Sequence, residues 1–459
     1  MLTLDRYKVF EFTKYEYNED NVLKLYYKID NNLEFIEEIN FNPNKIKLRE
    51  LNLDEKKALD LAFKYLHLVA GVSYYKLLLP DIIKIDTISL TKDQKEFFDK
   101  LYLKGLGEFA CRNNIDLREK INFPYDDMVK NESSKINLND DFIVPIGGGK
   151  DSMVTLELLK QNVKNKLNTF CVNNLGPIKD CCEMANCDNI YVTRKISPLL
   201  LEINKDLVKF GAFNGHVPIT SIIIFISVCA GIIYNCNTTV ISSENSANVG
   251  NLIFNGMTVN HQWSKSFEAE LMINNFIQKY VVMNFNYFSL LRPFSELQIA
   301  KMFAKIGKYN KVFSSCNKNF KISKIANQKR WCNDCDKCRF VFLIFAPFIK
   351  KDELIEIFGE NLLSEDKQYE GYKELTGLTG YKPFECVGEI EECIVAFSLL
   401  EKTEFKDDLI VVKIIREINE RFTSKKIKEL EKKYFTFHFE NTLLPKEIEE
   451  SIKQCQILK

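Results

Sequence analysis

Residues 142–157 read Phe-Ile-Val-Pro-Ile-Gly-Gly-Gly-Lys-Asp-Ser-Met-Val-Thr-Leu-Glu, and this stretch decides the fold of the chain. An apolar strand runs into three glycines, and an apolar pattern typical of a helix begins at Met153. Glycines allow the close approach of a phosphate, and the free N–H groups at a helix start favour an anion. The order of strand, glycine loop and helix therefore predicts a phosphate-binding loop, the alternative being a turn without a ligand. Its spacing matches neither the Walker P-loop nor the dinucleotide pattern Gly-x-Gly-x-x-Gly.

Strands and helices alternate from residue 140 onward, a pattern that favours a parallel sheet with right-handed crossovers. We expect strands at 142–146, 169–172, 189–192 and 239–242, and helices at 153–161, 199–208 and 219–234. Ligands of such sheets bind beyond the carboxyl ends of the strands, and the glycine loop falls there. The predicted fold class is therefore α/β, with helices on both faces of a parallel sheet.

The length of 459 residues predicts two or three domains. Residues 1–135 form an expected α+β region, which includes one long apolar helix at 59–79. The α/β domain is expected over 140–349. Residues 350–459 are expected to be mainly helical, apart from a loop at 376–389 that is rich in glycine.

The 63 Lys and Arg residues balance the 63 Asp and Glu residues, so the net charge is zero. Proteins whose main task is binding nucleic acid are usually basic, so no nucleic-acid partner is expected. The segment 301–339 is a local exception, with 11 Lys and Arg residues against two Asp residues. It could contact RNA, a nucleotide or a diphosphate, or form a solvated helix face.

The chain begins without the basic and apolar pattern of a signal peptide, and it contains 14 cysteines. Thiols without an export signal indicate a reducing compartment, so we expect a cytoplasmic protein without a disulfide framework. The apolar run 217–234 approaches the length of a membrane span, but it contains Pro, Ser, Thr and Gly. It is expected to be a helix buried against the sheet, and no membrane association is predicted.

Cys332, Cys335 and Cys338 are separated by two residues each, and Cys316 lies sixteen residues before the first of them. Four thiolates suit a tetrahedral structural zinc ion, an iron–sulfur cluster uses similar spacing, and free thiols are the third alternative. A bound metal would hold the basic segment against the sheet.

Three further segments carry side chains that can transfer protons. His216 stands at the start of an expected helix, and His261 and Lys265 share a short segment with an aromatic residue and a glutamate. Cys386 lies in the loop at 376–389. The alternatives for these segments are a packing histidine, a surface loop and a structural linker.

The glycine loop resembles the pyrophosphate loop, Ser-Gly-Gly-x-Asp-Ser, of ATP pyrophosphatases, which cut ATP between its α- and β-phosphates. Four residues match this motif, and Gly147 stands where those enzymes usually carry serine. The resemblance implies a HUP-type parallel sheet and an ATP-binding loop. The loop would comprise Gly147, Gly148, Gly149, Lys150, Asp151 and Ser152.

Blocks over nearly the whole chain resemble one family more closely, the ATP-dependent UDP-N-acetylmuramoyl-L-alanyl-L-glutamate epimerases of bacterial cell-wall synthesis. The blocks are His-Leu-Val-Ala-Gly-Val-Ser-Tyr-Tyr-Lys (67–76), Pro-Ile-Gly-Gly-Gly-Lys-Asp-Ser (145–152), Gly-His-Val-Pro-Ile-Thr (215–220), Asn-His-Gln-Trp-Ser-Lys-Ser (260–266), Arg-Pro-Phe-Ser-Glu-Leu (292–297), Trp-Cys-Asn-Asp-Cys-Asp-Lys-Cys-Arg-Phe-Val-Phe (331–342) and Lys-Pro-Phe-Glu-Cys-Val-Gly-Glu (382–389). The pyrophosphate loop alone would specify only the superfamily. The histidine blocks and the C-terminal loop narrow the resemblance to this family.

The resemblance implies inversion of the terminal L-glutamate to D-glutamate, with ATP and magnesium used and AMP and pyrophosphate released. Adenylation of the α-carboxylate would remove its charge, so that the α-proton can leave without building a dianion. In this scheme the glycines and Ser152 hold the phosphates, Lys150 offsets charge on the leaving group, and Asp151 places magnesium. The substrate would be a UDP-sugar dipeptide, and the product would serve peptidoglycan synthesis, cell shape and cell division.

The bases that act at the glutamate Cα are left open among His216, His261, Lys265 and Cys386. Lys382, a cation close to Cys386 in sequence, would lower the pKa of its thiol and make it a reasonable base. A second interpretation is an enzyme of the same superfamily that modifies tRNA or a nucleoside, by thiolation or amide formation, through adenylation. A third is a nucleotide-binding sensor without catalysis. The sequence leaves open the oligomeric state and the region that binds the UDP-sugar.

Overall fold

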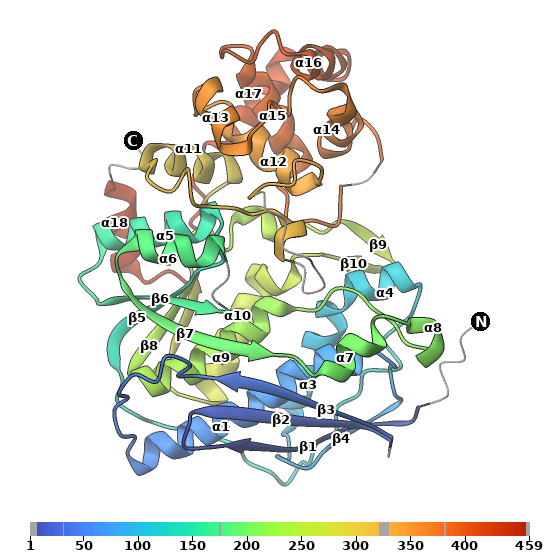
Figure 1. Ribbon diagram of the computed structural model, residues 1–459, viewed down its shortest axis with the longest axis vertical. Coiled ribbons are helices and arrows are strands. Elements are labelled where there is room, and N and C mark those ends of the chain that lie inside the picture. The colour runs from blue at the N-terminus through green and yellow to red at the C-terminus, as the bar shows by residue number, and fades with distance from the viewer. Residues whose placement is uncertain (1–6, 31, 174–175, 321–329, 381, 456–459) are drawn as a thin grey trace.

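A computed structural model describes residues 7–30, 32–173, 176–320, 330–380 and 382–455 of the chain. Within these residues, nine strands form one sheet in the order β11-β8-β5-β6-β7-β3-β2-β1-β4 (Figure 1). Its strands are β1 (Val9–Tyr17), β2 (Val22–Ile29), β3 (Leu33–Asn40), β4 (Ile82–Ile85), β5 (Asn139–Pro145), β6 (Leu167–Val172), β7 (Asp188–Lys195), β8 (Cys236–Ile241) and β11 (Asn286–Ser289). A separate hairpin pairs β9 (Leu252–Phe254) with β10 (Met257–Val259).

The strands β7, β6, β5, β8 and β11 lie side by side and run parallel. Numbered along the chain, their order is 3-2-1-4-5, so the direction of strand addition reverses between β5 and β8. Ligands of open α/β sheets bind at such a switch point, beyond the carboxyl ends of the strands. The α/β class and the four predicted strands are confirmed. The sequence did not predict β11, because this strand is too short to show an alternation of apolar and polar residues. The HUP-type identity of the sheet stays a prediction.

The N-terminal strands extend the same sheet. β3 pairs antiparallel with β7, with Ile39 opposite Arg194, and β2 and β1 follow as antiparallel neighbours. Alternate residues of β2 are buried, which is the pattern of a strand with one face packed against the core and the other partly exposed. The first two predicted regions therefore share one continuous sheet.

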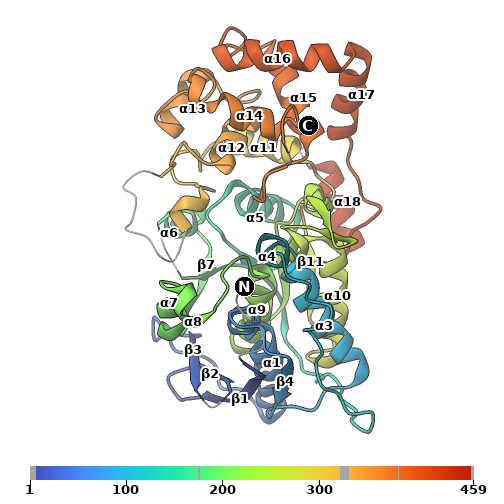
Figure 2. The ribbon, with the colours of Figure 1, turned by 90° about the vertical axis from the view of Figure 1, so that its right-hand side faces the viewer.

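Alternate side chains of β5 point to opposite faces of the sheet, with Phe142 and Val144 in one apolar core and Ile143 in the other. Helices cover both faces, as predicted (Figure 1, Figure 2). One core contains α1 (Leu53–Ala70), α3 (Lys92–Gly105), α9 (Ile219–Tyr234) and α10 (Phe267–Tyr280), and the other contains α5 (Lys150–Asn162), α6 (Pro177–Ala185), α11 (Glu296–Ile306) and α12 (Asp336–Phe345).

The apolar run 217–234 supplies α9, and most of this helix is buried, which confirms the prediction. A Cβ at Gly231 would lie 2.7 Å from the carbonyl oxygen of Cys236, so the close approach of α9 to β8 requires glycine there. Among the residues that the structure describes, no helix is both long enough and apolar enough to cross a bilayer.

Two predicted helices are divided in the structure. The helix expected at 59–79 ends at Ala70 and is followed by α2 (Val72–Tyr75), with Gly71 packed so closely on the Phe12 ring that a Cβ would collide with it. The helix expected at 199–208 consists of α7 (Pro198–Ile203) and α8 (Leu207–Phe210). Apolar periodicity marks both segments, but tertiary packing sets where each helix ends.

The C-terminal part is mainly helical, and most of it lies at one end of the molecule (Figure 1, Figure 2). Its helices are α13 (Lys351–Phe358), α14 (Tyr369–Leu375), α15 (Ile390–Leu400), α16 (Leu409–Arg421), α17 (Ser424–Tyr434) and α18 (Lys446–Gln454). The last of them packs against α5, one of the helices that cover the sheet, since Ser451 Oγ donates to Asn162 Oδ1 at 2.9 Å at the end of that helix. Within the predicted loop at 376–389, Tyr381 lies outside the described residues.

Candidate functional site

The predicted phosphate-binding loop joins β5 to α5 at the switch point of the sheet. Gly148 has φ = +77°, and a Cβ there would lie 3.0 Å from the backbone N of Ile178. A Cβ at Gly149 would lie 2.6 Å from Ser315 Oγ, whereas a Cβ at Gly147 would meet nothing within 4 Å. The fold therefore requires glycine at the second position; a Cβ at the third would displace the Ser315 hydroxyl, and the first borders open space.

Lys150, at the start of α5, is fully buried and forms ion pairs with Asp151 and with Glu296 of α11. Burial disfavours its charge, but the two carboxylates outweigh burial and raise the pKa of Lys150, so its ammonium stays protonated. Burial is likewise outweighed at Asp151, where Lys150, Lys337 and Lys265 lower the pKa of the carboxyl. The role predicted for Lys150 at a leaving phosphate stays a prediction.

Sequence reasoning missed two buried carboxylates beside this loop. Glu296 is the first residue of α11, and burial raises the pKa of its carboxyl. Burial also raises the pKa of Glu392 in α15, to about 8, and this side chain accepts a hydrogen bond from the Leu297 N–H at 2.9 Å. Ser152, the last residue of the predicted loop, donates to the Gly149 carbonyl at 3.2 Å. Glu296 lies within the block 292–297, but a glutamate in the first turn of a helix is common, so the residue type alone singles out neither position.

The four side chains predicted as bases come from distant segments and meet in one cluster. His216 precedes α9, His261 and Lys265 follow β10, and Cys386 lies between α14 and α15. Lys265 Nζ lies 3.4 Å from Cys386 Sγ, and His261 also hydrogen-bonds to this thiol. The rings of His216 and His261 have centroids 4.6 Å apart. The fold thus brings these residues together, and their catalytic roles stay a prediction.

Glu108 in α4 (Gly107–Asn113) completes the cluster. Its carboxylate accepts a hydrogen bond from His261 Nδ1 and lies 3.7 Å from His216 Nδ1, while Arg112 donates to its other oxygen at 2.5 Å. A carboxylate on Nδ1 sets the tautomer of a histidine and leaves Nε2 for another partner. Sequence reasoning missed Glu108, because 153 residues separate it from His261.

Charges within the cluster set its protonation. Burial raises the pKa of the Cys386 thiol, but Lys265, His261 and Lys337 outweigh burial and lower it to about 6. Burial lowers the pKa of His261, but its hydrogen bond to Cys386 contributes most to raising it to about 9. Burial and the neighbouring His261 lower the pKa of His216 to about 4. At neutral pH the cluster therefore holds a thiolate, an imidazolium and a neutral histidine.

The cluster lies beside the glycine loop. Lys337 of α12 donates to the Cys386 carbonyl. The charges of Lys265 and Lys337 both lower the pKa of the Asp151 carboxyl in the loop. Arg292 holds the segment that carries Lys265, because its guanidinium donates to the Lys265 carbonyl at 2.6 Å and pairs with a buried carboxylate of α10. An anion bound at the loop would therefore lie near the thiolate and its cations.

Two groups of side chains could hold a metal. The sulfur atoms of the four predicted ligands, Cys316, Cys332, Cys335 and Cys338, all lie within 4.8 Å of one another. Two sulfur–sulfur distances are 3.5 and 3.7 Å, and a tetrahedron of zinc–sulfur bonds of about 2.3 Å has edges of roughly 3.8 Å. This donor set fits a structural zinc ion. Residues 321–329, part of the predicted basic segment, lie outside the described residues.

The second group consists of Glu108, His216 and His261, whose ligand atoms also lie within 4.8 Å of one another. A direct hydrogen bond already joins Glu108 to His261. His216 Nδ1 lies 3.7 Å from the same carboxylate, which is too far for a hydrogen bond.

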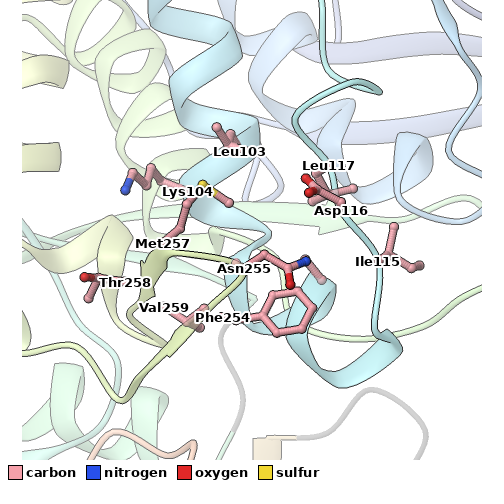
Figure 3. Close-up of a pocket in the computed structure, with 12 residues that line it drawn as sticks. Leu103, Lys104, Ile115, Asp116, Leu117, Phe254, Asn255, Met257, Thr258 and Val259 are labelled. Carbon is pink, nitrogen blue, oxygen red and sulfur yellow. The ribbon is translucent and has the colours of Figure 1, made fainter.

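A largely apolar surface pocket lies between α3, α4 and the β9–β10 hairpin (Figure 3). Leu103, Leu117 and Met257 are among the side chains that line it. None of the candidate site residues lines this pocket, so it is separate from the cluster around Cys386.

A glycine loop at the switch point of a parallel sheet, next to a thiolate and an imidazolium, is typical of an α/β enzyme with acid–base groups beside its sheet edge. The MurL N-terminal domain family matches residues 1–290 of the chain, and the MurL C-terminal domain family matches residues 312–429. The chain belongs to this family, which confirms the resemblance predicted from the sequence.

Three relatives, each named UDP-N-acetyl-alpha-D-muramoyl-L-alanyl-L-glutamate epimerase, match most of the chain. The protein of Xanthomonas oryzae pv. oryzae is 40% identical over 79% of the chain and 79% of its own length. The protein of Salinispora tropica is 38% identical over 80% of the chain and 79% of its own length. The protein of a Micromonospora species is 39% identical over 77% of the chain and 78% of its own length. No solved structure matches the chain.

Proposed function

We propose that this protein is an ATP-dependent isomerase of peptidoglycan precursor synthesis. It would convert the terminal L-glutamate of UDP-N-acetylmuramoyl-L-alanyl-L-glutamate to D-glutamate. Its three curated relatives are named for this epimerase activity. The observation that carries the proposal is the convergence of Cys386, His261 and Lys265 beside the glycine loop.

The glycine loop would bind the phosphates of ATP in the manner of a pyrophosphate loop on a HUP-type sheet. Backbone N–H groups at the start of α5 face this position, and Gly147 borders open space. Attack of the substrate α-carboxylate on the α-phosphate would give a mixed anhydride and release pyrophosphate. Magnesium, when bound, would neutralise phosphate charge, and Asp151 and Glu296 are the carboxylates that would hold it.

The activated carboxyl carries no charge, so removal of the Cα proton gives an enolate in place of a dianion. At neutral pH the Cys386 thiolate and neutral His216 can accept a proton, whereas the imidazolium of His261 and the ammonium of Lys265 can donate one. An ammonium near the carboxyl group would also stabilise the enolate oxygen. Acceptors and donors in one cluster are what an inversion of Cα requires.

We further propose a structural zinc ion at the four clustered cysteines and a cytoplasmic location. The sulfur geometry supports the first proposal. All 14 cysteines lie in the described part of the chain and none of them forms a disulfide there, which supports a reducing compartment.

The test is an incubation with ATP, magnesium and UDP-N-acetylmuramoyl-L-alanyl-L-glutamate, in which pyrophosphate and glutamate chirality are assayed together. We expect AMP, pyrophosphate, D-glutamate in the hydrolysed product and solvent deuterium at the glutamate Cα. Pyrophosphate release that depends on tRNA, without turnover of this substrate, would contradict the proposal and favour a nucleic-acid-modifying enzyme.

A further inference from the structure

Cys386, His261 and Glu108 form a continuous chain of hydrogen bonds. The thiol contacts the imidazole, and Nδ1 of the imidazole contacts the carboxylate. A nucleophile, a base within hydrogen-bonding reach and a third group that orients the base are the three parts of an activated nucleophile. A side chain that only accepts a proton needs neither a base nor a group that orients the base.

The surroundings of the sulfur favour attack on carbon over removal of a proton. Lys265 lies 3.4 Å from Sγ, and His261 and Lys337 add positive charge nearby. These cations keep the thiolate populated at neutral pH, but they weaken it as a proton acceptor, because basicity falls with the pKa. A thiolate retains much of its nucleophilicity under the same conditions, since nucleophilicity falls less steeply than basicity.

We propose that Cys386 is a nucleophile that receives the activated glutamyl group as a thioester before Cα is inverted. This inference rests on the proposed function, because it needs a carboxyl group that has first been activated as an acyl-adenylate. Cys386 then acts on the carbonyl carbon, and the proton transfers at Cα belong to its neighbours.

Acylation of Cys386 starts from the acyl-adenylate. The thiolate attacks the carbonyl carbon of the mixed anhydride, a C–S bond forms, and the bond from that carbon to the phosphate oxygen breaks. The electron pair goes to the phosphate oxygen of AMP, and the imidazolium of His261 gives that oxygen its proton. The products are a neutral thioester, neutral His261 and AMP.

Acylation removes the negative sulfur that favoured the proton on His261. Neutral His261, still oriented by Glu108, then becomes a proton acceptor beside the thioester. Lys265, next to the sulfur, can stabilise the oxygen of the thioester enolate. Lys265 gives its proton to Cα on the face opposite His261, and solvent then takes the Cα proton from His261 and returns a proton to Lys265. In the last step neutral His261 takes a proton from water, the hydroxide forms a C–O bond to the carbonyl carbon, and the C–S bond breaks to restore the thiolate.

The first test looks for the acyl group on the wild-type protein. The full chain is mixed with ATP, magnesium and UDP-N-acetylmuramoyl-L-alanyl-L-glutamate, quenched in acid within one turnover, and analysed by peptide mass spectrometry. We expect an adduct on Cys386 with the mass of the substrate less one water, dependent on ATP and removed by neutral hydroxylamine. Cys386→Ser should hold the same group as an ester, and Cys187→Ala, outside the cluster, should leave the adduct unchanged.

The second test uses Cys386→Ala to separate a nucleophile from a base. Loss of the nucleophile should leave one equivalent of pyrophosphate per chain, with AMP retained as acyl-adenylate and its release slowed by at least about 1000-fold. Loss of a base alone would leave AMP release intact and return L-glutamate.

Wild-type turnover with no adduct at any quench time, or unchanged AMP release in Cys386→Ala, would overturn the thioester and leave the proposed function standing. A wild-type protein that releases no pyrophosphate and forms no D-glutamate would overturn both.

Discussion

The charge state of Cys386 depends on residues that are remote from it in the sequence. The sequence suggested Lys382 as the cation that activates this thiol, but the groups that lower its pKa most are Lys265, His261 and Lys337. These side chains come from two other segments of the chain, the one that follows β10 and the start of α12. The presence of a reactive cysteine could therefore be predicted from the glycine-rich loop, whereas its partners could not.

The rate at which iodoacetamide alkylates Cys386 should rise with the fraction of thiolate, and the midpoint of this rise should lie near pH 6. Replacement Lys265→Met removes the cation 3.4 Å from the sulfur and should raise this midpoint by roughly one to two pH units. Mass spectrometry of the alkylated peptide after brief exposure at pH 5–9 measures both values. Lys57→Met on the exposed side of α1 is the matched control, and a wild-type midpoint above pH 8 would contradict the assignment.

Activity should fall on both sides of neutral pH. Below about pH 6 the Cys386 thiolate takes up a proton, and above about pH 9 His261 loses one. Because the two groups are in contact, the limbs of the profile report the pair and not either residue alone. The pH dependence of kcat/KM measures this profile, and a rate that keeps rising to pH 10 would show that the imidazolium is not required.

At the scale of elements, the turn from β5 into α5 is determined by its own sequence and by what packs on it. The turn itself requires a positive φ at Gly148, which favours glycine. The close approach of Gly148 to the N-terminus of α6, by contrast, exists only in the folded chain. Gly147, the position at which related loops carry serine, has room for a side chain.

Replacement Gly148→Ala should slow pyrophosphate release by about 100-fold, because a Cβ at positive φ would displace the loop against Ile178. Gly147→Ala adds the same methyl group one residue earlier, where nothing lies within 4 Å, and should fold and melt like the wild type. Single-turnover assays and thermal melts separate the two effects. Equal loss of activity and stability in both variants would contradict the requirement for glycine at position 148.

The contact between α15 and α11 should make stability depend on pH. Glu392 accepts from the Leu297 N–H, and burial raises the pKa of this carboxyl to about 8. Between about pH 4.5 and pH 8 the unfolded chain releases this proton while the folded chain keeps it, so this group lowers stability as pH rises. Glu392→Gln keeps the acceptor without the charge, and should raise the melting temperature at pH 8.5 by roughly 5 °C and at pH 5 by much less. An equal change at both pH values would exclude the buried carboxyl as its cause.

At the scale of the whole molecule, the four clustered cysteines connect the C-terminal helices to the site. Cys335 and Cys338 lie around the first turn of α12, and Lys337 between them reaches the carbonyl of Cys386. A metal at this position would fix the start of α12 and with it the loop that carries the thiolate.

The purified protein should contain one zinc ion per chain. Cys335→Ser should lose the metal, lower the melting temperature by on the order of 10 °C, and reduce epimerase activity through the displaced loop. Elemental analysis and thermal melts are the measurements, with Cys187→Ser as the control. Full metal content in Cys335→Ser, or iron in place of zinc, would contradict this assignment.

The sequence by itself determined the α/β class, the glycine loop between β5 and α5, the buried helix α9 and the family, because these depend on local periodicity and on blocks of adjacent residues. It also marked His261, Lys265 and Cys386 by their residue types. Only the tertiary structure decided that these side chains contact one another, that Glu108 orients His261, and that the N-terminal strands extend the parallel sheet. Contacts between segments more than 100 residues apart depend on packing and burial, and no pattern within a short window of sequence encodes them.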